Sequence, residues 1–397
     1  MVLKQFILEN WKNTYRSGQA TTESLKLPKP FTVPCMDGGF KNFFYWDTYF
    51  TNIGLLLSGE TEQAKNNLEN IAYLIRTHGF MPNADHLLDR SQPPLFACGV
   101  WDYYQATGDD TVLAPFASAI EEELIFWRER RTDESGLSYY GFEDNGQAKA
   151  FFNEINPRVG LSVDSEEQAE YEGRNLFAIA ESGWDFTHRY QTEKSPVDIC
   201  HFAPVDLNCI LCEAERICGK IFHLIGNEAK GNEFLKASEK RKSLIEAKMK
   251  RSDGTYGDYD KYEKAPSAFR SAASFLPFVC DISTDSEAFQ KTLAPLELPY
   301  GVSTTEQLEN GYQWDFPNVW PPLTYFAVVA AKKTGNEEAA KRLANKYLSV
   351  QEQLFSDTEQ LWEKYNGLTG ALPEKSEYGT PPMMGWTAGV YLYLLEK

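Results

Sequence analysis

The stretch SGETEQAKNNLENIAYLI, residues 58–75, contains the pattern that decides the fold. Gly59 is suited to end one helix in the left-handed conformation, and the capping and acidic residues after it suit the start of the next helix. Beyond this turn, apolar side chains recur at helical spacing, at Ala64, Leu68, Ile71, Ala72 and Ile75. The stretch therefore predicts a tight turn that leads into an amphipathic helix.

The same kind of turn occurs at three further points. It reads TGDD at 107–110, IGNE at 225–228 and TGNE at 334–337. Few segments alternate with the period of a strand, and no Pro/Ser-rich linker divides the chain. We therefore expect an all-α fold of stacked helical hairpins in one domain, residues 1–397. Two stretches rich in Gly, Asp, Glu and Tyr, about 133–170 and 250–265, are predicted to be long loops over one end.

The composition disfavours several classes of partner. A net charge of −18 makes nucleic acid and anionic membranes poor partners, because phosphate binding needs clustered Lys and Arg. No stretch approaches the roughly 20 apolar residues of a membrane span. Aromatic residues make up 14% of the chain, which suits both a large core and stacking on sugar faces. The oligomeric state is left open.

The N-terminal sequence and the cysteines bear on the cellular compartment. The sequence MVLKQFILENW lacks the charged, apolar and small-residue regions of a signal peptide. The chain has seven cysteines, an odd number. Cys209 and Cys212 form one CxxC in an apolar helical run, which favours buried free thiols over a metal or redox pair. These features predict a cytoplasmic protein.

Several segments break the helical pattern by combining Trp, Asp or Glu, Arg, Gly and Pro. They lie at 38–49, 81–83 with 90–94, 181–186, 313–317 with 320–323, 361–366 and 385–387. Trp-Asp occurs in three of them, at 46–47, 184–185 and 314–315. An indole packs on the C–H face of a pyranose, and a neighbouring carboxylate accepts hydrogen bonds from sugar hydroxyls. The alternative, in which Trp-Asp only starts a helix, stays open for any single pair.

Glycoside hydrolysis requires two carboxyl groups in opposite protonation states. Asp185, between Trp184 and Phe186, has the apolar neighbours that raise a carboxyl pKa, so it is the candidate acid. Glu363, beside Lys364, is the candidate for the ionised partner. The alternatives are a solvent-exposed helix cap for Asp185 and a solvent-facing lysine at 364.

Other chemistries lack their motifs. There is no HExxH, the five histidines lack metal-ligand spacing, and neither GxSxG nor a phosphate-binding loop occurs. We therefore expect no metal and no cofactor. His188, three residues after Asp185, is either a proton carrier or, as the pattern favours, a polar helix residue.

Taken together, these segments resemble the trehalase family of inverting α-glucosidases. The likeness rests on GGF with YWD at 45–47, PN at 82–83 with RSQPP at 90–94, ESGWDF at 181–186, QWDFP at 313–317 with WPPL at 320–323, EKY at 363–365 and GWT at 385–387. These motifs follow the family's order over about residues 30–390 of the chain. The resemblance implies an (α/α)6 toroid with the active site at one end, acting on a small-molecule substrate without a cofactor.

The resemblance also implies roles for individual residues. Asp185 matches the general acid and Glu363 the general base, whose carboxyl groups we expect to lie about 6.5–9.5 Å apart. The residues that match the substrate pocket are Phe40, Trp46, Asp47, Asn83, Arg90, Gln92, Arg158, Gly183, Trp184, Gln313, Trp314, Trp320, Glu377 and Trp386.

The chain departs from the family pattern on the side of the leaving group. Gly39 stands where the family has Arg, Asn42 and Gly160 stand where it has Glu, and Val319 replaces a Gly. We therefore expect a glycosidase that cleaves an α-glucosidic bond with inversion, with trehalose as one candidate substrate. The close alternative is a related toroid enzyme acting on another α-glucoside or an α-mannoside, such as a glucosylglycerate-like compound.

Two more distant alternatives concern other classes of protein. A toroid sugar isomerase or epimerase usually works with paired histidines, but here the histidines fall outside the Trp-Asp pairs. A non-catalytic sugar-binding protein is disfavoured because both Asp185 and Glu363 are present.

Overall fold

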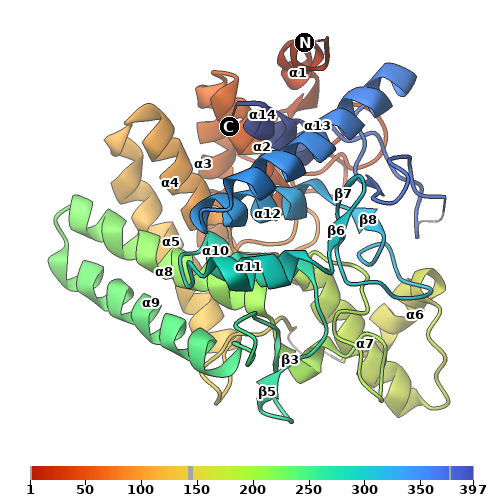
Figure 1. Ribbon diagram of the computed structural model, residues 1–397. Coiled ribbons are helices and arrows are strands. Elements are labelled where there is room, and N and C mark those ends of the chain that lie inside the picture. Colours follow the sequence, from red (N-terminus) through yellow and green to blue (C-terminus); the bar gives the residue numbers. More distant parts are fainter. Residues whose placement is uncertain (1, 142–145, 375–376, 397) are drawn as a thin grey trace.

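The computed structural model describes residues 2–141, 146–374 and 377–396, which are dominated by helices (Figure 1). The helices are α1 (Val2–Asn10), α2 (Tyr45–Leu57), α3 (Thr61–His78), α4 (Phe96–Thr107), α5 (Leu113–Arg130), α6 (Ala148–Val159), α7 (Glu166–Ser182), α8 (Val205–Leu224), α9 (Glu228–Lys248), α10 (Leu276–Val279), α11 (Ser286–Leu293), α12 (Pro321–Lys333), α13 (Glu337–Thr358) and α14 (Gly385–Glu396). No helix within these ranges is both long and apolar enough to cross a membrane.

Short strands cover the ends of the helical body. They pair antiparallel as β1 (Tyr15–Arg16) with β2 (Phe31–Thr32), β3 (Phe202–Ala203) with β4 (Tyr259–Asp260), β4 with β5 (Ala265–Pro266), β6 (Glu297–Leu298) with β7 (Gly301–Val302), and β8 (Asn318–Val319) with β9 (Tyr365–Asn366). The β8–β9 pair joins the segment after Trp314 to the segment after Glu363.

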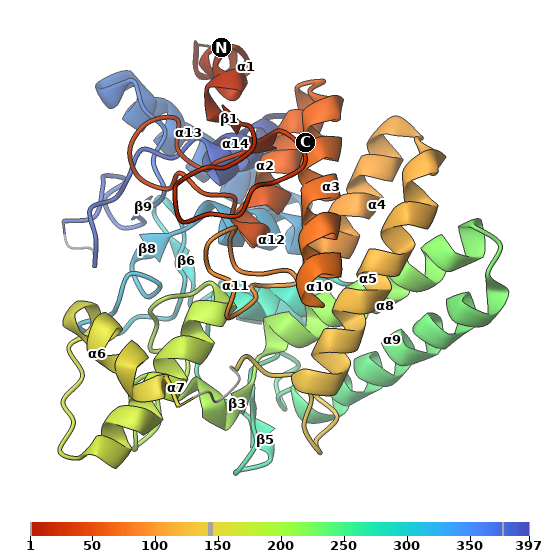
Figure 2. The ribbon, with the colours of Figure 1, turned by 180° about the vertical axis from the view of Figure 1, so that it is seen from behind.

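The helices form a closed ring. Helices α2, α4, α8, α10, α12 and α14 contact one another in that order, and α14 returns to α2. The two ends of the chain therefore lie side by side, as both views show (Figures 1 and 2). Helices α3, α5, α9 and α13 pack outside this ring against their neighbours in sequence. This arrangement confirms the predicted (α/α)6 toroid.

The ring closes through direct contact between two backbones. A Cβ atom added to Gly389 of α14 would lie 2.0 Å from the carbonyl oxygen of Phe50 in α2. A Cβ atom added to Gly54 would lie 2.7 Å from the Cα atom of Gly389. Only glycine permits so close an approach, so these two positions fix how α2 and α14 pack.

The glycines of the recurring turns have the predicted conformation. Gly59, Gly108, Gly226 and Gly335 have φ angles of 78°, 68°, 81° and 72°, in the left-handed region. Each turn leads into an outer helix, namely α3, α5, α9 or α13. The glycine conformation is therefore confirmed, whereas within the described residues a side-chain cap follows only two of the four turns, at Asp109 and Asn227.

The prediction of a long loop over residues 133–170 is wrong in part. This stretch contains α6 and the first turns of α7, and residues 142–145 lie outside the described part of the chain. Phe152 and Val159 of α6 are buried, and Gly173 of α7 lets the carbonyl of Ala148 approach so closely that a Cβ atom would lie 2.0 Å from it. Packing against α7 stabilises this helix.

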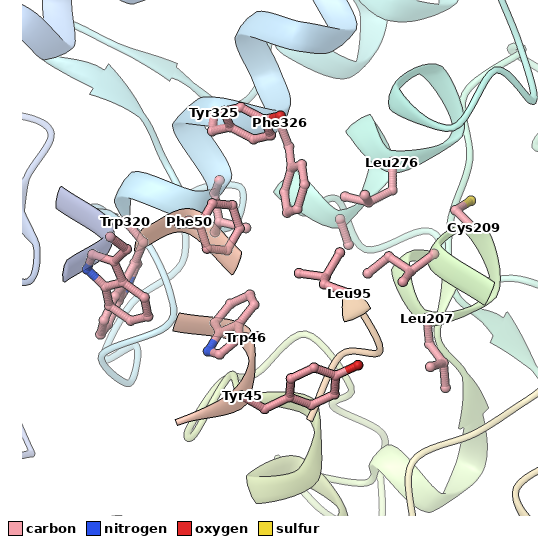
Figure 3. Packing of buried hydrophobic residues seen from close by; sticks show 14 of the residues in the cluster. Tyr45, Trp46, Phe50, Leu95, Leu207, Cys209, Leu276, Trp320, Tyr325 and Phe326 are labelled. Atoms are coloured by element: carbon pink, nitrogen blue, oxygen red, sulfur yellow. The ribbon is translucent and has the colours of Figure 1, made fainter. Parts of the chain in front are cut away.

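The core fills the interior of the ring. Figure 3 shows Trp46 and Phe50 of α2 beside Trp320, Tyr325 and Phe326 at the start of α12. These side chains are at most 9% exposed. Aromatic side chains therefore fill the interior of the ring at this level.

Candidate active site

A cavity of about 720 Å³ opens where the segments that break the helical pattern converge. Thirteen of the sixteen predicted site residues line it: Phe40, Trp46, Asp47, Asn83, Arg90, Gln92, Arg158, Gly183, Asp185, Trp314, Trp320, Glu363 and Trp386. Their segments are far apart in sequence and meet because the ring brings the starts of α2, α12 and α14 together with the end of α7.

Tryptophan side chains form one wall of the cavity and the layer behind it. The rings of Trp314 and Trp320 stack with centroids 3.7 Å apart and an interplanar angle of 5°. Trp184 stacks behind Trp314 at 5.6 Å, and Trp46 lies 5.6 Å from Trp314. Trp386 packs edge-on to Trp320 at 5.8 Å. These indoles are at most 4% exposed, so they form a tightly packed apolar wall.

Asp185 lies in an extended segment that begins where α7 ends. Gly183 ends the helix at φ 76°, and the next residue, Trp184, is 1% exposed. The carbonyl of Asp185 accepts a hydrogen bond from Nε2 of Gln313 at 2.8 Å, and the carbonyl of Phe186 accepts one from the Trp314 amide at 3.0 Å. The backbone of Asp185 and Phe186 is therefore held against the 313–314 segment.

The surroundings of the Asp185 carboxyl group favour its protonated form. Its side chain is 36% exposed and lines the cavity. Burial by the surrounding protein raises the pKa of Asp185, and Arg158 and Arg90 oppose that rise. The Nη2 atom of Arg158 lies 3.6 Å from Oδ2. A carboxyl group with a raised pKa beside an open cavity can act as a general acid.

The Glu363 carboxyl group has different surroundings. Glu363 is 1% exposed, and the ammonium of Lys364, 0% exposed, donates a hydrogen bond to its Oε2 atom. The hydroxyl of Tyr378 donates to Oε1 at 2.8 Å. Burial raises the pKa of Glu363, while Lys364 and Tyr378 oppose that rise by stabilising the carboxylate. Two donors on one carboxyl group suit an ionised base.

Aromatic rings hold Lys364 in place. Its Nζ atom lies 4.8 Å from the ring centroid of Trp320 and 4.6 Å from that of Tyr378. The carbonyl of Glu363 accepts a hydrogen bond from the indole of Trp386 at 3.2 Å. The lysine is therefore buried beside the carboxylate, and the solvent-facing alternative is excluded.

A third carboxyl group, that of Asp47, lines the same cavity. Asp47 is 7% exposed and lies in the first turn of α2. Burial, together with the charges of Glu363 and Asp185, raises its pKa to about 8. The raised pKa favours the protonated form, in which this group can donate a hydrogen bond to a ligand oxygen.

Three of the predicted residues lie behind the cavity lining. Trp184 is covered by Trp314, with which it stacks. The side chain of Gln313 points to the Asp185 carbonyl, and its own carbonyl accepts a hydrogen bond from the Trp320 indole at 3.0 Å. Glu377 lies beyond Arg158, and these two residues border a second cavity of about 520 Å³. All three support groups that do line the first cavity.

The carboxylate of the third Trp-Asp pair, Asp315, has a structural role. Asp315 is fully buried and accepts hydrogen bonds from the Thr187 hydroxyl at 2.7 Å, the His188 amide at 3.0 Å and the Tyr312 amide at 2.8 Å. The ring of His188 contacts the same carboxylate through Nδ1 at 2.8 Å and stacks on Tyr312. His188 is absent from the lining of the larger cavity. Asp315 therefore has a structural role without starting a helix, whereas Trp314 of the same pair lines the larger cavity.

Sequence reasoning missed several residues that line the cavity: Phe44, His86, Phe151, Phe186 and Tyr378. Tyr378 matters most, because it hydrogen bonds to Glu363. Tyr378, between Glu377 and Gly379, belongs to no periodic pattern or motif, so the sequence offers no reason to select it. Among the described residues, no group of three or more His, Cys, Asp or Glu side chains is placed to hold a metal ion.

Comparison with known proteins identifies the family of this chain. The model of the family described as trehalase matches residues 3–397 of the chain. The chain belongs to the trehalase family. Among its relatives, a periplasmic trehalase of Xanthomonas campestris pv. campestris (strain 8004) is 31% identical over 422 residues, which cover 99% of this chain and 73% of that protein. A periplasmic trehalase of Pseudomonas aeruginosa PAO1 is 32% identical, with 96% and 73% covered. The protein is therefore a glycosidase, as the motifs predicted.

A solved structure supports the fold. The neutral trehalase Nth1 from Saccharomyces cerevisiae has a TM-score of 0.76 to this chain at 21% sequence identity. The match covers 100% of this chain and 80% of the yeast chain. At this level of identity the likeness concerns the fold, and it agrees with the closed helical ring.

The predicted cytoplasmic location is wrong, since the bacterial relatives are named periplasmic trehalases. The cysteines explain why this inference failed. All seven are free, and burial raises the pKa of every one. A protonated, buried thiol reacts poorly. Free cysteines of this kind therefore say little about the redox state of the surroundings.

Proposed function

We propose that this protein hydrolyses trehalose to two molecules of glucose with inversion at the attacked carbon, and that residues 1–397 form one toroid domain. The observation that carries the proposal is a pair of carboxyl groups, Asp185 and Glu363, which face one cavity beside different cations, Arg158 and Lys364. The cavity volume of about 720 Å³ falls in the range of sites for small molecules, which suits a disaccharide.

In this mechanism Asp185 is the general acid and Glu363 the general base. Asp185 donates its proton to the glycosidic oxygen as the bond to the anomeric carbon breaks. Glu363 accepts a proton from a water molecule, whose oxygen forms the new bond from the opposite face. Asp185 ends ionised and Glu363 protonated, so one proton must return through solvent before the next turnover. Trehalose would then release one glucose as the β anomer and the other as the α anomer.

The remaining lining residues are proposed to bind the substrate. The indoles of Trp46 and Trp314, which line the cavity, are proposed to pack against a sugar ring, and Trp320 supports Trp314 by stacking on it. Asp47, with its pKa raised to about 8, is proposed to donate a hydrogen bond to a sugar hydroxyl or its ring oxygen. Arg158 and Arg90 are the cations that border the cavity beside Asp185.

Two isosteric variants test the catalytic roles. Asp185→Asn and Glu363→Gln should each lower kcat on trehalose by about 10³-fold or more, because general acid or base assistance contributes roughly that much. ¹H NMR of the first products should show equal amounts of α- and β-glucose. Glu193→Gln, which removes an exposed carboxyl group close in sequence to Asp185, is the control and should keep full activity.

α-Glucosyl fluoride separates the acid from the base. Fluoride leaves without protonation, so Asp185→Asn should keep much of its activity on this substrate. Glu363→Gln should lose activity on both substrates, because water activation is still needed. Substantial activity of Asp185→Asn on trehalose, or two α anomers among the first products, would refute the proposed roles.

Another α-glucoside is the second candidate substrate. Gly39 lines the cavity at φ 43°, and a side chain there would start 2.8 Å from Sγ of Cys35. Gly160, at φ 76°, caps α6 where the family has a glutamate. The leaving-group side therefore lacks two family side chains. Ranking kcat/KM for trehalose against glucosylglycerate, kojibiose and maltose decides between the candidates.

A further inference from the structure

Three indoles of the site form a stack with a cation at each end. Trp184 stacks on Trp314 with ring centroids 5.6 Å apart, and Trp314 stacks on Trp320 at 3.7 Å. At one end, the guanidinium carbon of Arg189 lies 4.6 Å from the ring centroid of Trp184. At the other end, Nζ of Lys364 lies 4.8 Å from that of Trp320. An indole face attracts a cation, so both ends of the stack are held.

Each end of this indole stack is next in sequence to one of the two catalytic carboxyl groups. Trp184 directly precedes Asp185, the proposed acid. Lys364 directly follows Glu363, the proposed base, and donates a hydrogen bond to its carboxylate. An inverting enzyme needs a set separation between acid and base, because a water molecule must fit beside the base. The indole stack therefore links the two groups whose separation matters.

Two buried carboxylates hold the guanidinium of Arg189, whose side chain is 0% exposed. Nη1 and Nη2 donate to Asp206 at 3.0 and 2.7 Å, and Nε and Nη2 donate to Asp258 at 2.8 and 2.5 Å. Asp206 lies in the first turn of α8, and Asp258 also accepts a hydrogen bond from the amide of Val205, where α8 begins. Arg189 is therefore fixed to a helix of the ring, and it holds the Trp184 end of the stack there.

The segment between Asp185 and Arg189 is also tied to the middle of the stack. The amide of Arg189 donates to the Thr187 hydroxyl at 3.1 Å, and this hydroxyl donates to Asp315 at 2.7 Å. Asp315 directly follows Trp314, the middle indole. A displacement of Arg189 is therefore passed to Asp185 both through the Trp184 ring and along this short segment.

We propose that Arg189 is a positioning residue, which fixes the Trp184 end of the indole stack so that the stack holds Asp185 at its working distance from Glu363. Arg189 is absent from the lining of the catalytic cavity, so it acts through Trp184 and not on the substrate. The proposal rests on the proposed function, because this distance has a catalytic purpose only if the two carboxyl groups are acid and base.

The test is the activity of Arg189→Lys on two substrates. Lysine keeps a positive charge for Asp206 and Asp258, but its ammonium lacks the flat, forked shape that binds both and stacks on an indole. A misplacement of about 1 Å lowers a rate about 100-fold, so kcat/KM on trehalose should fall by that factor. On α-glucosyl fluoride, which needs no acid, kcat/KM should fall much less, because Glu363 keeps its own contacts.

Arg241→Lys is the matched control for this variant. Arg241 is also a buried arginine, and its 9% exposed side chain pairs with Glu215 at 2.7 Å where α9 packs on α8. This variant should lose stability without changing the ratio of the two activities. A merely structural role of Arg189 would lower both activities equally. Equal losses in Arg189→Lys, or an altered ratio in Arg241→Lys, would overturn the proposal.

Trp184→Phe tests the indole stack without changing the ion pairs of Arg189, and it serves also if Arg189→Lys does not fold. The smaller ring has less contact with Arg189 and Trp314, so activity on trehalose should again fall more than on the fluoride. The double variant should lose less on trehalose than the product of the two single losses, since both changes act through one stack. Losses that simply multiply would show that Arg189 does not act through Trp184.

Crystal structures separate this inference from the proposed function. The separation of the Asp185 and Glu363 carboxyl groups should change by about 1 Å in Arg189→Lys or Trp184→Phe, while the contact between Glu363 and Lys364 stays. An unchanged separation in both variants would refute the role of Arg189. If the wild-type protein hydrolysed none of the glucosides, the proposed function would fail, and this separation would still support or refute the positioning.

Discussion

The two carboxyl groups of the site differ in how their neighbouring cations are held. Lys364 is 0% exposed and contacts only one carboxylate in the site, that of Glu363, which is 1% exposed. Arg158 is 34% exposed and divides its contacts between Asp185 and Glu377. A dedicated buried cation favours the ionised form of its partner, whereas a shared and partly solvated cation does so weakly. The two carboxyl groups therefore differ in how strongly a neighbouring cation stabilises their ionised forms.

The different roles of Asp185 and Glu363 predict how activity changes with pH. The pKa values of Asp185 and Glu363 are both raised by burial. The base works only when ionised, so activity should rise with pH through the pKa of Glu363. The acid works only when protonated, so activity should fall as pH passes the pKa of Asp185. A bell-shaped profile is expected, and each limb reports one side of the site.

The largest effect should come from Lys364→Met. Loss of the ammonium removes the main group that opposes the raised pKa of Glu363, so the acid limb should move up by about two pH units. Below that limb kcat/KM should fall about 100-fold, as measured on trehalose between pH 4 and 9. Lys364→Arg keeps the cation and serves as the control. An acid limb that stays in place in Lys364→Met would show that the lysine does not tune Glu363.

A smaller effect on the same limb is expected from Tyr378→Phe. The hydroxyl donates to Oε1 of Glu363 at 2.8 Å, and a hydrogen bond to a charged group is worth about 1.5–3 kcal/mol. With Lys364 retained, kcat/KM should fall about tenfold and the acid limb should move up by less than in Lys364→Met. Tyr300→Phe, at a residue that is 43% exposed, should leave kinetics unchanged. A downward shift of the acid limb would contradict the assigned contact.

The smallest effect should come from Gly183→Ala, beside the acid. Alanine at φ 76° costs about 1 kcal/mol, and its Cβ atom would lie 3.1 Å from Cε2 of Trp46. The free energy of unfolding should fall by about 1–2 kcal/mol, with a loss of a few fold in kcat/KM. Gly59→Ala has the same strain at φ 78° but nothing within 4 Å, so it should lose stability without losing activity. Equal kinetics of the two variants would show that Trp46 adjusts freely.

Much of the fold follows from local sequence. The glycine turns and the apolar spacing are local properties, so they predict α3 and α13 without knowledge of the rest of the chain. Helix α6 was missed because its burial depends on α7, a contact that local periodicity cannot contain. The closure of α2 on α14 through Gly54 and Gly389 is likewise invisible locally.

The residues of the candidate site were also only partly predictable from local sequence. The segments around Asp185 and Glu363 combine residue types that helical periodicity does not explain, so they were identified from the sequence. Asp47 and Asp315 both follow a tryptophan, yet one lines the cavity and the other is fully occupied by Thr187 and backbone amides. Residue type cannot separate these outcomes, because the difference arises from partners distant in sequence.

The parallel indoles of Trp314 and Trp320 have an optical consequence. Two chromophores whose centroids lie 3.7 Å apart in nearly parallel planes couple their electronic transitions. Both rings border the catalytic cavity, so a bound sugar should change the intensity and the emission of this pair. The enzyme thus has an intrinsic spectroscopic reporter of occupancy, which Trp320→Phe would silence while the other tryptophans keep their signal.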